Sequence, residues 1–62
     1  MRKNSSELAQ RHRVSQAQGM VSLQAHCGFG DALAMMNERA TVNGETLLDI
    51  ADAVLSHRAS FT

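Results

Sequence analysis

The chain contains no proline, tryptophan or tyrosine, and its only aromatic residues are Phe29 and Phe61. Strands favour β-branched and aromatic residues, so this composition argues against a β-sheet. The core has to be built from small aliphatic residues and four methionines, which suit closely packed helices. The composition therefore predicts an all-α fold.

Cysteines and long apolar runs are scarce as well. A single cysteine, Cys27, excludes an internal disulfide and is typical of a reducing compartment. No apolar run approaches the roughly 20 residues that a membrane-spanning helix needs. Polar residues follow Met1-Arg2-Lys3, so no signal peptide is predicted. We therefore expect a cytoplasmic protein with no membrane partner.

A chain of 62 residues is long enough for one small domain, which would bury only about 60% of its unfolded surface. No internal repeat or linker divides it, so residues 1–62 are predicted to form a single domain. Helices are expected at about 6–26, 29–42 and 47–58. Together they predict a small three-helix bundle with a long first helix.

The first predicted helix carries one apolar stripe at spacings of three and four residues. Ser5 or Ser6 is a candidate N-cap, and the glycines of the Cys27-Gly28-Phe29-Gly30 segment are expected to end the helix. The residues of the stripe are Val14, Ala17, Val21 and Ala25.

Turn and cap signals also delimit the second and third helices. Asn43-Gly44 is suited to the left-handed end of the second helix, and Thr46 with Asp49 has the spacing of a capping box for the third. The expected inner faces are Phe29, Ala32, Leu33, Met36 and Ala40 in the second helix, and Leu47, Ile50, Ala51, Val54 and Leu55 in the third.

A glycine in the middle of the first helix costs about 1 kcal/mol relative to alanine, so Gly19 needs a reason. Helical periodicity places it beside Leu8 and Leu23, away from the apolar stripe. A bundle with one core has no use for this second apolar side. We therefore expect it to contact something outside the bundle, and predict a homodimer through the first helix.

Metal binding and catalysis are not predicted, although His12, His26, Cys27 and His57 are potential ligands. His12 lies fourteen residues before His26, about 21 Å along a straight helix, so the ligands cannot converge. Cys27 lacks the positioned base that a nucleophile needs. Its candidate base, His26, is the adjacent residue, and adjacent side chains on a helix point apart. We expect no enzyme activity and no cofactor.

An ordered set of residues resembles the ANTAR domain, an RNA-binding module of bacterial transcription antiterminators, in its actinobacterial type. The resemblance covers roughly residues 8–58, with Gln18 standing where the family usually has lysine. The residues that carry it are Arg11, Val14, Ala17, Gln18, Gly19, Ala32-Leu33, Arg39-Ala40, Gly44, Leu47, Asp49, Ile50-Ala51 and Val54-Leu55.

The resemblance implies that the chain recognises stem-loops in nascent leader RNA and so regulates transcription by antitermination. It also implies an upstream sensor domain, for which residues 1–62 have no room. Arg11, Ser15, Gln18 and Ser22 share a helical face that we expect to be exposed. The predicted RNA-binding residues are Arg11, Arg13, Ser15, Gln18, Gly19 and Arg39.

Charge leaves alternatives open, because the net charge is zero. Residues 1–27 are basic and residues 28–62 are acidic, which suits an anionic partner on one face and equally suits ordinary solvated helices. The main alternative is a helical dimerisation or interaction module with no nucleic-acid role. Binding to duplex DNA is a third and less favoured alternative, because Asp49 and Asp52 in the third helix would repel phosphates.

Overall fold

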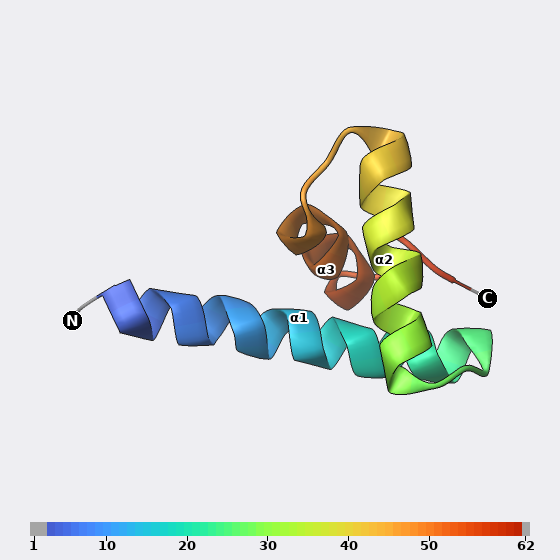
Figure 1. Ribbon diagram of the computed structural model, residues 1–62, viewed down its shortest axis with the longest axis horizontal. Helices are drawn as coiled ribbons and strands as arrows, with labels where there is room; N and C mark the ends of the chain where they lie inside the picture. Colours follow the sequence, from blue (N-terminus) through green and yellow to red (C-terminus); the bar gives the residue numbers. More distant parts are fainter. Residues whose placement is uncertain (1–2, 62) are drawn as a thin grey trace.

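A computed structural model describes residues 3–61, with side chains from Glu7 to Phe61. It contains three helices and, within that range, no strand: α1 (Lys3–Ala25), α2 (Phe29–Asn43) and α3 (Leu47–Leu55). Figure 1 shows α2 crossing the C-terminal part of α1, with α3 in the corner between them. The N-terminal part of α1 extends beyond the other two helices. The predicted all-α three-helix bundle with a long first helix is confirmed.

The start of α1 differs from the prediction. The helix begins at Lys3, so Ser5 and Ser6 lie inside it and neither is the N-cap that we expected. Their side chains fall outside the described ones. At the other end α1 stops at Ala25, and the residue in the left-handed conformation is His26, with φ 56°, rather than a glycine.

The predicted signals around α3 are present in the structure. Gly44 ends α2 with φ 69°, a conformation that costs glycine little because it has no Cβ. The hydroxyl of Thr46 accepts a bond from the Asp49 N–H, and the Asp49 carboxylate accepts one from the Thr46 N–H, each at 3.1 Å. This reciprocal pair is the predicted capping box.

The predicted third helix, 47–58, is too long by one turn. The N–H of Arg58 donates to the Ala53 carbonyl at 2.7 Å, and the N–H of His57 donates to the Val54 carbonyl at 3.1 Å. With His57 at φ 62°, these bonds close the helix in the Schellman arrangement. The chain then turns back, and residues 56–61 return along the bundle (Figure 1).

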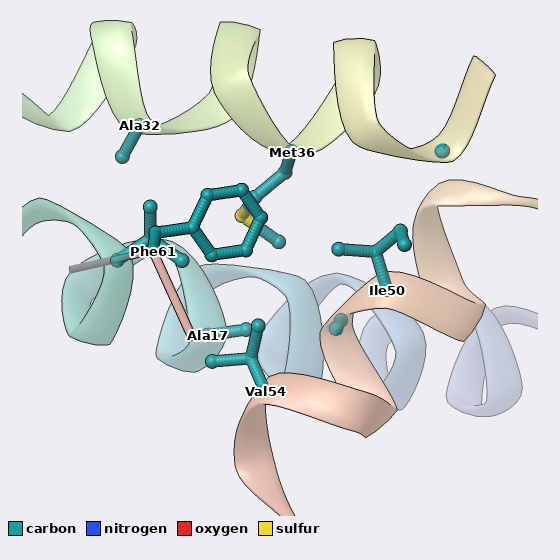
Figure 2. Close-up of a cluster of buried hydrophobic side chains, with 9 residues drawn as sticks. Ala17, Ala32, Met36, Ile50, Val54 and Phe61 are labelled. Atoms are coloured by element: carbon teal, nitrogen blue, oxygen red, sulfur yellow. The ribbon is translucent and has the colours of Figure 1, made fainter. Parts of the chain in front are cut away.

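The core contains many of the residues that periodicity selects, together with one that it does not. Four of the predicted residues, Val14, Ala25, Leu47 and Leu55, are only partly buried against it. Leu33, which we expected inside, is in neither group, because it falls at the edge of the face that the buried residues of α2 share. Phe61 reaches from the C-terminal tail into the cluster (Figure 2) and is only 6% exposed. Phe29, which we expected inside, is 53% exposed, because it begins α2 and meets α1 through its carbonyl rather than its ring. The buried apolar residues are Ala17, Val21, Ala32, Met36, Ala40, Ile50, Ala51, Val54 and Phe61.

Candidate nucleic-acid interface

An open groove of about 560 Å³ lies where the N-terminal part of α1 meets the start of α3. Spacings of three and four residues place its α1 residues on one helical face. Apolar side chains come from both helices, and polar groups come from α1. The lining residues are Glu7, Gln10, Arg11, Val14, Ser15, Leu47 and Leu48.

Two of the six predicted RNA-binding residues meet in this groove. Arg11 and Ser15 are exposed and both line it. One turn of helix separates them, so a guanidinium and a hydroxyl are presented to the same space. Arg11 with Ser15 is therefore the only part of the predicted site, among the described residues, that one groove brings together.

Arg13 lies on the same helix but is engaged with α3. One of its guanidinium nitrogens is 3.3 Å from a carboxylate oxygen of Asp52, and both side chains are partly exposed. A surface pair of this kind contributes about 0 to 1 kcal/mol and weakens in salt. Arg13 is therefore held, but only weakly, and a stronger anion could draw it away from Asp52.

Gln18 is buried, at 7% exposure, so the prediction that it shares the exposed face is wrong. Its side-chain amide donates a 2.7 Å hydrogen bond to the Phe29 carbonyl. That bond ties the middle of α1 to the first residue of α2. Gln18 consequently holds the two helices together and is not a surface residue of the candidate interface.

Two more polar residues of α1 are used in the same structural way. The Ser22 hydroxyl donates to the Cys27 carbonyl at 2.6 Å, and the side-chain carbonyl of Gln24 accepts the Phe61 N–H at 3.0 Å. The polar face predicted from periodicity therefore divides. Its N-terminal half, Arg11 and Ser15, faces solvent, whereas its C-terminal half, Gln18 and Ser22, binds Phe29 and the α1–α2 connection.

Arg39 lies in a separate region of the surface. Its guanidinium carbon is 4.1 Å from the centre of the Phe61 ring, a distance typical of a cation–π contact. These two residues line a smaller hollow of about 230 Å³ together with Met35, Glu38 and Val42, and none of the five lines the larger groove. The role of Phe61 is not predictable from the sequence pattern, because no helical period extends into the tail.

The second apolar side of α1 is exposed, as expected. Leu8 is 61% and Leu23 is 78% exposed. A Cβ built at Gly19 would meet nothing within 4 Å, so packing inside the bundle does not require a glycine there. The surface around Gly19 is therefore open to close approach by another molecule.

Other candidate chemistry does not assemble in the described residues. Within 3–61 no three histidine, cysteine or acidic residues gather as a metal site would need. The partly buried Cys27 thiol instead points to the Met35 sulfur at 3.9 Å. None of the described helices combines the length and apolar character required to cross a membrane.

No protein-family model, curated protein or solved structure matches this chain.

Proposed function

We propose that this chain is an RNA-binding module of transcription antitermination that recognises stem-loops in nascent leader RNA. Holding the RNA in one fold prevents an adjacent terminator hairpin from forming. This action needs no covalent chemistry, because bound protein shifts the folding equilibrium of the RNA by mass action. Arg11 and Ser15 form the centre of the proposed contact surface, with Arg13 beside them.

The observation that carries the proposal is the way the residues of the resemblance divide between structure and surface. Gly44 and Asp49 form the helix boundaries on either side of the α2–α3 connection, while Arg11 remains exposed. An ordered set of residues that serves a three-helix fold and leaves a basic group outside suits a small RNA-binding domain. The buried members of the set are Ala17, Gln18, Ala32, Ala40, Ile50, Ala51 and Val54.

A leader RNA with two hairpins is expected to bind more tightly than an unrelated hairpin, and Arg11→Ala should weaken that binding about tenfold. Losing one phosphate contact should also reduce the slope of log affinity against log salt by about 1. Gel-shift titrations at about 50 and 200 mM salt measure both effects.

Gln16→Ala is the matched control, since Gln16 is also exposed on α1 but does not line the groove. Equal affinity of the wild-type protein for the leader and the unrelated hairpin at both salt concentrations would refute the proposed function.

Asp52→Asn is expected to strengthen RNA binding several-fold at low salt, because it releases Arg13 from its ion pair and removes a charge that repels phosphate. The gain should shrink as salt rises, since exposed charges are screened. The cost in folding free energy should stay below about 1 kcal/mol.

Asp31→Asn removes the same charge from the exposed surface of α2 and serves as the control. If both variants bind RNA equally well, release of Arg13 is not the cause of any gain.

We further propose that the protein acts as a homodimer through the side of α1 that carries Leu8, Gly19 and Leu23.

Gly19→Ala should stabilise the monomer fold by about 0.5 to 1 kcal/mol, because alanine is the better helix former and the site has room. The same change should weaken self-association, since a methyl group separates the two helices where they cross. Sedimentation over a concentration series, with Leu23→Glu as a second disruptive variant, measures the association. A wild-type protein that stays monomeric at every concentration, with and without RNA, would exclude the dimer.

The exposure of Leu8 and Leu23 also favours a second candidate function, a dimerisation or interaction module without RNA binding. The two candidates differ in one measurement. A module of the second kind self-associates equally well with and without RNA, and its association is unaffected by Arg11→Ala.

A further inference from the structure

The groove between α1 and α3 has the composition of a site for a flat, neutral and partly apolar ligand. Val14, Leu47 and Leu48 supply apolar surface, while Gln10 and Ser15 offer an amide and a hydroxyl. Sites for small ligands commonly combine apolar walls with a few polar groups that fix orientation, in volumes of about 300 to 1,000 Å³. The volume of about 560 Å³ lies within that range.

Charge narrows the choice of ligand. The groove is lined by one carboxylate, Glu7, and one guanidinium, Arg11, so its formal charges cancel. A phosphate held inside would lie near the Glu7 carboxylate as well as the Arg11 guanidinium, so repulsion would offset the attraction. A nucleobase is neutral, has apolar faces and carries hydrogen-bond donors and acceptors along its edge, so Glu7 and Gln10 can bind that edge.

We propose that this groove binds one unpaired nucleotide from the loop of the RNA hairpin. The base enters between Val14 and Leu48, its edge contacts Gln10 and Glu7, and Arg11 contacts the phosphate beside it at the groove mouth. Sequence-specific recognition of RNA depends largely on such splayed-out loop bases. This inference rests on the proposed function and adds Gln10, Leu48 and Glu7 to the contact surface.

The test uses the whole chain and a set of hairpin RNAs, each with 2-aminopurine at one loop position. Binding is expected to change the fluorescence of one position much more than the others. Leu48→Ala and Gln10→Ala should each weaken binding of the looped hairpin about tenfold, the loss of one well-made base contact. Affinity for a blunt duplex of the same stem should stay unchanged, because that RNA presents no unpaired base.

Val42→Ala is the control for Leu48→Ala, since Val42 is an exposed aliphatic residue on α2 away from the groove. Gln10 is exposed, so its substitution tests the groove even if Leu48→Ala unfolds the protein. Thermal melting by circular dichroism identifies any such unfolding.

The outcomes separate this inference from the proposed function. If the wild-type protein binds the leader hairpins selectively but no loop position responds, or if the variants weaken loop and duplex equally, the groove is not the nucleotide site and the RNA-binding function stands. If the variants weaken self-association in sedimentation and leave RNA affinity unchanged, the groove is a protein contact and the inference is overturned. If the wild-type protein fails to discriminate any hairpin, both proposals fall.

Discussion

Phe61→Ala is expected to lower the free energy of unfolding by about 3 to 5 kcal/mol, the range for removing a buried aromatic ring. Phe61 is the only aromatic side chain buried in the described part of the chain, and Figure 2 shows it among core residues of all three helices. The change also removes the ring against which the Arg39 guanidinium stacks. A domain of 62 residues has a total stability of only about 3 to 9 kcal/mol, so the variant should be largely unfolded or melt more than about 10 °C lower.

The chain provides its own control in Phe29→Ala. Phe29 is the same residue type but is more than half exposed, so its replacement should change the unfolding free energy by about 0.5 kcal/mol or less. Urea denaturation followed by circular dichroism compares the two variants directly. If the two substitutions lower the unfolding free energy equally, the Phe61 ring is not buried in the core.

These two phenylalanines show how far the sequence predicts the fold. Repeating apolar positions select Val21, Met36 and Ile50 correctly because each lies on a helix whose period continues on both sides. Phe61 follows α3 in an irregular tail, where no period exists, and its burial depends on the tail folding back over α1. Phe29 has the right spacing for the inner face of α2. It is the first residue of that helix, however, and its side chain is not covered by α1 or α3.

The helix ends follow the same division. The Thr46–Asp49 capping box and the Gly44 terminus depend on residues within a few positions of each other, so the sequence predicts them well. The left-handed conformations of His26 and His57 are not signalled by residue type, since such positions are usually glycine or asparagine. They are adopted because the chain has to turn there to bring α2 and the tail against α1.

The candidate site is predicted less well than the fold. A helical period identifies which residues share a face, and it correctly placed Arg11 with Ser15. It does not reveal where another element covers that face, so it could not show that Gln18 is buried against the Phe29 carbonyl. The contribution of Leu47 and Leu48 to the groove likewise depends on the position of α3, which only the tertiary structure gives.

Ile50→Ala is expected to cost about 2 to 5 kcal/mol, because it leaves a cavity in the centre of the bundle. Ile50 is among the largest fully buried side chains and projects from α3 into the core with Val54 (Figure 2). α3 has only nine residues, too few for a stable helix in isolation, so its folding depends on this packing. Removing the side chain should therefore unfold α3 together with the α1–α3 groove.

A graded pair of variants makes this prediction specific. Ile50→Val removes a single methylene group and should cost only about 0.5 to 1.5 kcal/mol, while Leu23→Ala on the exposed side of α1 should cost about 0.5 kcal/mol or less in the monomer. Urea denaturation should show Ile50→Ala as the least stable of the three variants, Ile50→Val as intermediate and Leu23→Ala as the most stable. If Ile50→Ala is as stable as the wild-type protein, α3 does not pack through this residue. The position of α3, and with it the groove between α1 and α3, would then be wrong.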